Sequence, residues 1–229
     1  MILGVSAILL IDYNVNLAAR FIICAACIDM VDGIVARKFK VESSTGQVLD
    51  SIVDQVSFCL APGLLLFFVL DYVWYVRVAI VYIILICGAL RLARFGSGES
   101  KDTFDGLPTP AFAMTISAFV IAKVYQYTIG SIVIIITTIV FSFLMISSYQ
   151  YLKVGRMNQK YQKSSANILV NVFASMMILT LLFELFAPYI LGMVIPYLFL
   201  FFVLFYSIAG HFMYKLQGLA VSKIGKETK

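Results

Sequence analysis

The sequence predicts an all-α polytopic membrane protein, a transmembrane helical bundle with about eight spans. Hydrophobic residues make up 62% of the 229 positions, charged residues make up only 13%, and the mean hydropathy is +0.99. Soluble domains contain about 45–50% apolar and about 25% charged residues, so a soluble globular protein is excluded. The polar residues also fall mostly between apolar runs of roughly 20 residues, the length that crosses a bilayer as a helix.

The first apolar run, residues 1–11, is too short to cross a membrane. As a helix it would extend ~16 Å, against ~30 Å of hydrocarbon. We therefore expect either a re-entrant segment or, preferably, the second half of a span whose beginning precedes residue 1.

The remaining spans are set by apolar runs that end at polar turns, basic residues or prolines. They are expected at residues 17–37, 47–70, 74–92, 111–127, 131–152, 166–187 and 191–213. Pro62 and Gly63 predict a kink in the third span, and Pro188 ends the seventh. The longest polar loop in the N-terminal part is expected at residues 91–110.

No solenoid repeat and no linker between domains is visible, so residues 1–213 are predicted to form one transmembrane domain. Its core is expected at about residues 17–152, with an additional pair of spans at about 166–213. Residues 214–229 are basic and are predicted to form a solvated cytoplasmic tail.

The basic residues indicate the orientation of the bundle. All but three of the 17 Lys and Arg residues follow the even-numbered spans, and the exceptions are Arg20, Arg77 and Lys123. Because basic loops stay in the cytoplasm, the ends of the even spans are expected there, in the cell (inner) membrane. The net charge of +5 does not indicate nucleic-acid binding, because it lies in short loops between apolar spans.

Four acids interrupt the second and third spans. Asp29 and Asp32 are three positions apart, Asp50 and Asp54 are four apart, and each pair therefore shares one helix face. Each pair lies about one to two turns from the polar connection at residues 38–45, so antiparallel helices would bring all four to a similar depth. An acid at the bilayer centre costs roughly 3 kcal/mol, and four together also repel. Pairing with buried arginines is the structural alternative, but too few basic residues lie at that depth.

Carboxylates without histidine or cysteine ligands select hard cations such as Mg²⁺, Mn²⁺ or Ca²⁺. Such sites most often bind phosphate or diphosphate groups. Gly33, Ala36 and Gly46 are small residues beside the acids that would let a bulky group approach the backbone. Arg37 ends the second span and could contact a phosphate oxygen. A carboxylate not bound to metal could accept a proton from an attacking hydroxyl.

The acids and their neighbours also form one continuous motif. The pattern D-x2-D-G-x2-A-R-x8-G-x3-D-x3-D is met by Asp29, Asp32, Gly33, Ala36, Arg37, Gly46, Asp50 and Asp54. This pattern resembles the signature of the CDP-alcohol phosphatidyltransferase family. The resemblance implies that a hydroxyl attacks the lipid-bearing phosphate of a CDP-activated lipid and that CMP leaves.

The resemblance also implies roles for individual residues. By family analogy, Asp29, Asp32 and Asp50 hold the metal, Mg²⁺ or Mn²⁺, while Asp54 adds to the metal site or acts as the base. The CDP-lipid site would comprise Asp29, Asp32, Gly33, Ala36, Arg37 and Gly46. The lipid would be CDP-diacylglycerol or CDP-archaeol, reached from the surrounding membrane lipids. Dimers are common in the resembled family, so a homodimer is compatible with it.

Three later segments indicate the acceptor. Residues 57–62, 90–95 and 104–111 read S-F-C-L-A-P, L-R-L-A-R-F and F-D-G-L-P-T-P-A, in an order that resembles the phosphatidylserine synthase branch of the family. The match covers about the first 150 residues. It implies L-serine as the acceptor, and the serine carboxylate would need a cationic fork such as Arg91 or Arg94.

Pro108 and Pro110 are assigned to the same acceptor or phosphate site through their motif. Ordinary explanations exist for these residues: the arginines could anchor the cytoplasmic side, and residues 106–110 could be a plain loop that starts a helix. Three other functions stay open. They are transfer to another acceptor such as glycerol phosphate or inositol phosphate, a membrane prenyltransferase with aspartate-rich motifs, and a cation transporter with midplane acids.

Overall fold

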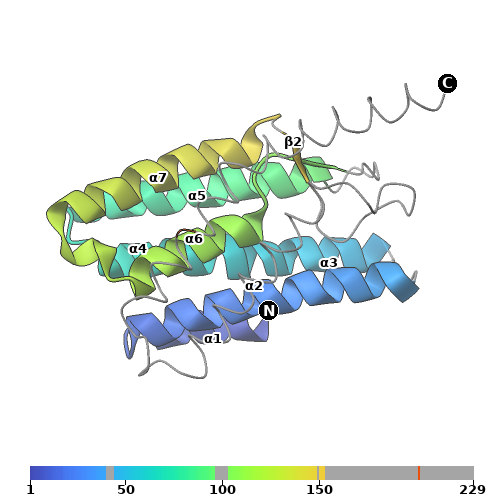
Figure 1. Ribbon diagram of the computed structural model, residues 1–229, viewed down its shortest axis with the longest axis horizontal. Helices are drawn as coiled ribbons and strands as arrows, with labels where there is room; N and C mark the ends of the chain where they lie inside the picture. The colour runs from blue at the N-terminus through green and yellow to red at the C-terminus, as the bar shows by residue number, and fades with distance from the viewer. Residues whose placement is uncertain (40–43, 96–102, 149, 153–200, 202–229) are drawn as a thin grey trace, which may run out of the picture.

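The computed structural model describes residues 1–39, 44–95, 103–148, 150–152 and 201. Apolar helices with short connections make up nearly all of this part of the chain (Figure 1). The predicted spans at 166–187 and 191–213 and the tail at 214–229 lie outside these residues, apart from residue 201. The helical elements are α1 (Ile2–Leu10), α2 (Val15–Phe39), α3 (Ser44–Asp54), η1 (Gln55–Leu60), α4 (Ala61–Val69), α5 (Trp74–Phe95), α6 (Thr109–Ile121), η2 (Val124–Gln126) and α7 (Thr128–Ile146). Two short strands complete the fold, β1 (Thr103–Asp105) and β2 (Gln150–Leu152).

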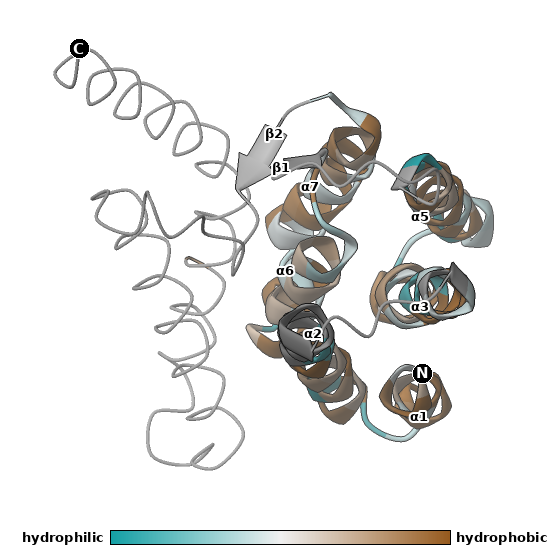
Figure 2. Cartoon of the chain, turned by 90° about the vertical axis from the view of Figure 1, so that its right-hand side faces the viewer, coloured by the Kyte–Doolittle hydropathy of each residue, from teal (hydrophilic) through white to brown (hydrophobic). Residues whose placement is uncertain are grey.

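The helices pack in two rows (Figure 2). One row contains α2, α6 and α7, and the other contains α1, the continuous α3–η1–α4 helix and α5. Buried side chains from both rows, such as Phe58, Leu66, Phe112 and Ile116, belong to one apolar core cluster. Helix α6 has only 13 residues, and it is buried along nearly its whole length.

Three helical stretches are long and apolar enough to cross a membrane: Val48–Val69, Trp74–Arg94 and Thr128–Ile146. Large apolar side chains such as Tyr82, Ile86, Ile129, Ile136 and Phe143 are exposed on their outer faces. Such a surface suits hydrocarbon rather than water. The described part of the chain therefore agrees with the predicted membrane bundle.

The third span is continuous, but its irregularity lies before the predicted kink at Pro62 and Gly63. The helix widens into the π-helical turn η1, and the Ala61 N–H donates to the carbonyl of Val56, five residues back. Pro62 has no N–H and its ring crowds the preceding turn. A wider turn directly before the proline accommodates this crowding without ending the helix.

The fifth and sixth spans end earlier than predicted. Helix α6 stops at Ile121, and Lys123 takes a left-handed conformation (φ 54°) before η2, so the expected span to residue 127 is wrong. Helix α7 ends at Ile146 rather than at residue 152, because Ser147 turns into extended backbone. Strand β2 then pairs antiparallel with β1, and β1 lies inside the segment 91–110 that was predicted to be a polar loop.

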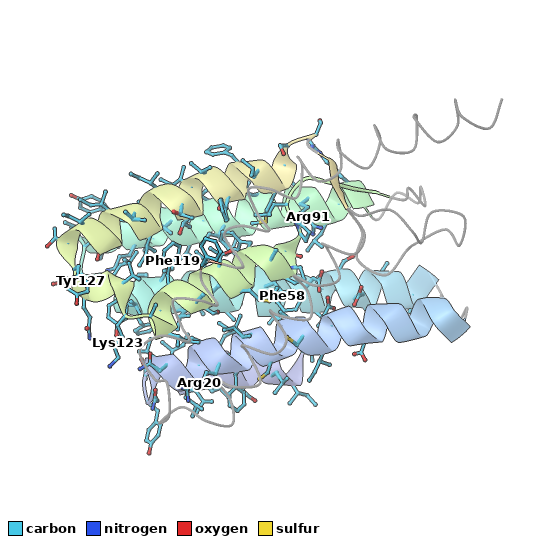
Figure 3. The ribbon with its side chains drawn as sticks, viewed as in Figure 1. Arg20, Phe58, Arg91, Phe119, Lys123 and Tyr127 are labelled. Atoms are coloured by element: carbon cyan, nitrogen blue, oxygen red, sulfur yellow. The ribbon has the colours of Figure 1, made fainter. Side chains whose placement is uncertain are left out.

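Among the basic residues whose side chains the structure describes, Arg91 and Arg94 lie at one end of the bundle and Arg20, Arg77 and Lys123 lie at the other. Arg94 donates to the carbonyl of Ile146, which places the C-terminal ends of α5 and α7 side by side. Arg77, near the start of α5, donates to the carbonyl of Phe67 at 3.0 Å. Figure 3 shows Arg20 and Lys123 toward the end of the bundle away from Arg91. These five residues are separated as the sequence predicts, and the assignment of one end to the cytoplasm stays a prediction.

Close packing of η1 against α5 generates a testable prediction. A Cβ added at Gly88 would overlap with the Cys59 sulfur and would lie 3.1 Å from Gln55 Oε1. A Cβ added at Gly63 would have no neighbouring atom closer than 3.5 Å. Overpacking typically costs about 1–3 kcal/mol of unfolding free energy. We expect Gly88→Ala to lower the thermal unfolding midpoint in detergent and Gly63→Ala, the matched control, to leave it nearly unchanged. Equal midpoints for the two variants would contradict this packing.

Candidate active site

Three of the four motif acids converge at one point. Asp29 on α2 and Asp50 and Asp54 on α3 each offer a carboxylate oxygen, and the three oxygens lie within 4.8 Å of one another. The two helices come from the hairpin that the sequence predicts, and the spacing of four residues places Asp50 and Asp54 on the same face of α3. The structure therefore brings these acids to a common depth.

Asp32 lies apart from the set of three. It is almost one helical turn beyond Asp29 on α2, and its side chain is exposed. It is still close enough to Asp50 for the two negative charges to interact. Asp32 therefore borders the cluster on its exposed side, next to Asp50, which is exposed as well.

Asp54 is the motif acid that reaches into the helix bundle. Its Oδ2 accepts a hydrogen bond from the Thr109 hydroxyl at 3.3 Å. Its Oδ1 is buried and has no hydrogen-bond partner among the residues that the structure describes. A buried carboxylate oxygen without a donor is costly, so this atom is suited to a ligand that carries positive charge or a proton.

Arg91 supports Asp54 indirectly. It lies on α5, is only 5% exposed, and donates from its guanidinium to the Thr109 hydroxyl at 3.0 Å. Figure 3 shows Arg91 beside the end of α6 at which Thr109 begins the helix. The chain of hydrogen bonds from Arg91 through Thr109 to Asp54 thus joins α5, α6 and α3.

Thr109 was not among the residues predicted for the site. The sequence carries one signal for it: a hydroxyl residue between two prolines, Pro108 and Pro110, at the start of an otherwise apolar helix. Pro108 caps α6 and Pro110 is its second residue. Both prolines therefore shape the turn that presents Thr109, while their assignment to the acceptor site stays a prediction.

The other predicted residues occupy the same end of the bundle. Gly33, Ala36 and Arg37 lie in the last turns of α2, although their side chains are not among those described. Gly46 is exposed in the first turn of α3. Arg94 is exposed and donates to the carbonyl of Ile146, so it lies nearer the surface than Arg91.

The cluster fits a hard divalent cation. Oxygens that share a cation at about 2.0–2.6 Å lie at most about 4–5 Å apart, and the three acidic oxygens meet this condition. The unpartnered Asp54 Oδ1 adds a donor atom of the right kind. Without a cation the close carboxylates would repel one another. Asp29, Asp50 and Asp54 could therefore hold Mg²⁺, Mn²⁺ or Ca²⁺, with Asp32 at the rim.

Comparison with known proteins places this site in a family. The family model for CDP-alcohol phosphatidyltransferase matches residues 1–144. The archaetidylserine synthase of Methanothermobacter thermautotrophicus is 35% identical over 156 residues, which cover 66% of this chain and 65% of that protein. Several proteins named CDP-diacylglycerol–serine O-phosphatidyltransferase also match. The one from Methanocaldococcus jannaschii is 39% identical over 67% of this chain and 69% of its own length. The one from Bacillus subtilis is 33% identical over 62% and 78%.

Direct measurement of Mn²⁺ binding tests the cluster. We expect the purified protein in detergent to bind Mn²⁺, detected by loss of the free-ion electron paramagnetic resonance signal. Asp50→Asn and Asp54→Asn should each weaken binding by at least about 10-fold, because each removes a charged ligand. The matched control is Asp71→Asn, an exposed aspartate in the connection between α4 and α5. Unchanged binding in the two site variants would show that the cluster holds no metal.

Proposed function

The chain belongs to the CDP-alcohol phosphatidyltransferase family, and from this premise we propose that it makes a serine phospholipid. The reaction would transfer the phosphatidyl or archaetidyl group of CDP-diacylglycerol or CDP-archaeol to the hydroxyl of L-serine. One observation carries the proposal: the acids that converge in space, Asp29, Asp50 and Asp54, are acids of the family motif. The three relatives described above supply the acceptor, since the name of each includes serine.

The proposed reaction is a single displacement at phosphorus. The serine hydroxyl oxygen forms a bond to the lipid-bearing phosphorus, the bond from that phosphorus to the CMP oxygen breaks, and CMP leaves with the electron pair. The hydroxyl proton passes to a carboxylate. Asp54 is the best candidate for this base, because its Oδ1 is buried and has no partner among the described residues.

The proposed metal ligands are the three converging acids, Asp29, Asp50 and Asp54, and Asp32 at the rim is proposed as a fourth. When bound, a divalent cation would neutralise negative charge on the diphosphate. The residues of the chain then have to position the two substrates. The last turns of α2, with Gly33, Ala36 and Arg37, and Gly46 at the start of α3 are proposed to receive the CDP group.

The acceptor site is proposed to include Arg91 and Arg94. A free amino acid must reach its site from water, and Arg94 is the more exposed of the two. Arg91 is buried and its guanidinium already donates to Thr109. Any effect of Arg91 on serine would therefore be exerted inside the bundle, close to Asp54, and not at the surface. Pro108 and Pro110 would contribute by fixing the turn before α6.

The protein is an integral membrane protein by its apolar helices and its family. We place it in the cell (inner) membrane with the active site toward the cytoplasm, because Arg91 and Arg94, two of the predicted cytoplasmic charges, lie at the same end as the acids. CDP-lipid would then enter from the inner leaflet and serine from the cytoplasm. A homodimer stays a prediction.

A panel of acceptors tests the proposed function. Purified protein in detergent should release CMP only when CDP-lipid, L-serine and Mg²⁺ or Mn²⁺ are present together. Glycerol phosphate, inositol, inositol phosphate and choline replace serine in parallel reactions. Turnover with one of these and not with serine would overturn the acceptor while keeping the family reaction. Metal flux into liposomes without any CDP-lipid would instead indicate a transporter.

The role of Asp54 is tested by Asp54→Asn. We expect this variant to lose turnover, because amide nitrogen and oxygen can neither accept the serine proton nor bind a cation as a carboxylate does. Binding of radiolabelled CDP-lipid, measured in the same preparation, separates the roles. Retained binding points to the base, and lost binding points to the metal. Near-normal turnover would remove Asp54 from the mechanism.

Arg94→Ala should raise the KM for serine more than the KM for the CDP-lipid, because the variant removes a cationic partner for the serine carboxylate. Arg77→Ala is the matched control, since Arg77 lies on the same helix at the opposite end and also donates to a backbone carbonyl. The reverse pattern in Arg94→Ala would place this residue at the lipid phosphate.

A further inference from the structure

We propose that Thr109 is a positioning residue for Asp54. Its hydroxyl, held by Arg91, would fix the Asp54 carboxylate through Oδ2 and leave Oδ1 for the cation or the acceptor proton. This inference rests on the proposed function, since it assumes that Asp54 serves the reaction. Its evidence is separate, because it comes from two hydrogen bonds and from the burial of Thr109 and Arg91.

The direction of the two hydrogen bonds follows from the chemistry of the groups. A guanidinium only donates and an ionised carboxylate only accepts, whereas a hydroxyl can do both at once. Thr109 Oγ1 accepts from Arg91 at 3.0 Å, so its own proton is free to point at Asp54 Oδ2, 3.3 Å away. Thr109 is fully buried, so water does not compete for either bond.

A hydroxyl between the two charges has a different effect from a direct ion pair. An arginine that meets a carboxylate directly often engages both oxygens with two parallel hydrogen bonds. Such a pair would occupy Asp54 Oδ1 and compete with a cation. Through Thr109, Arg91 constrains Asp54 at one oxygen only, and Oδ1 keeps no partner among the described residues.

The loop before α6 fixes the position of Thr109. Gly106 has a positive φ of 80°, and a Cβ there would lie 3.0 Å from the carbonyl carbon of Met145. The next residue, Leu107, donates its N–H to the carbonyl of Leu144 at 3.1 Å. The loop is thereby attached to the C-terminal end of α7. Thr109 then starts α6, whose positive N-terminal end also favours the nearby Asp54 carboxylate.

The test compares three variants of the 229-residue chain in detergent. Thr109→Val keeps the shape and removes the hydroxyl, and Thr109→Ser keeps the hydroxyl. Thr115→Val is the matched control, because Thr115 is equally buried on α6 but donates only to the carbonyl of Ala111 in its own helix. Thermal unfolding midpoints show whether each variant is folded.

We expect Thr109→Val to lower kcat by about 10- to 100-fold, with a much smaller change in the KM for serine, as for other residues that orient a metal ligand. It should weaken Mn²⁺ binding, measured by electron paramagnetic resonance, by a similar factor. Thr109→Ser should restore both quantities to within a few-fold of the parent, and Thr115→Val should resemble the parent.

Several results would overturn the inference. Parent-like kcat and Mn²⁺ affinity in Thr109→Val would do so, as would equal losses in Thr109→Ser and Thr109→Val. If Thr109→Val does not fold, Thr109→Ser is compared with Thr109→Ala, which lacks the hydroxyl, and equal activity of these two overturns it. A parent that releases no CMP refutes the proposed function instead. In that case the inference is refuted as well if Thr109→Val and Thr115→Val bind Mn²⁺ with the same affinity.

Discussion

Placing carboxylates inside an apolar helical bundle is the constraint on which the rest of this structure depends. Asp29 and Asp54 are partly buried, and an acid in such surroundings needs a donor, a cation or a proton. Asp54 obtains one donor from Thr109, whose hydroxyl is in turn held by Arg91. Its second oxygen receives none from the described residues, so this oxygen is available to a cation that Asp29 and Asp50 could also bind.

The scaffold directly after the acids is packed tightly on two sides. The π-helical turn η1 follows Asp54 without a break. On one side, a Cβ at Gly4 of α1 would lie 2.8 Å from the Ser57 Cα. On the other side, Gln55 Nε2 donates to the carbonyl of Leu85 at 3.0 Å, near Gly88 of α5. Close contacts of this kind limit the motion of the helix, and the catalytic role proposed for Asp54 requires a rigid support.

Polar connections assemble the end of the bundle that carries the site. Arg94 links α5 to α7, Arg91 links α5 to α6, and strands β1 and β2 pair beyond the same ends. The motif around Gly106 closes this arrangement by attaching the loop before α6 to the end of α7. The segment that the sequence associates with the acceptor therefore contributes directly to the surroundings of Asp54.

In the described part of the chain, the sequence by itself determined the membrane bundle, most of the helix positions, and the convergence of three of the four acids from α2 and α3. The helix positions depend on local hydrophobicity, and the shared faces of the acids depend on spacings of three or four residues within one helix. The convergence depends in addition on the short polar connection between the two helices. Only the tertiary structure decided that Asp32 lies at the rim, that α6 and α7 end early, and that Thr109 bonds to Asp54. Thr109 and Asp54 are 55 positions apart, and such a contact follows from how the helices pack rather than from any local pattern.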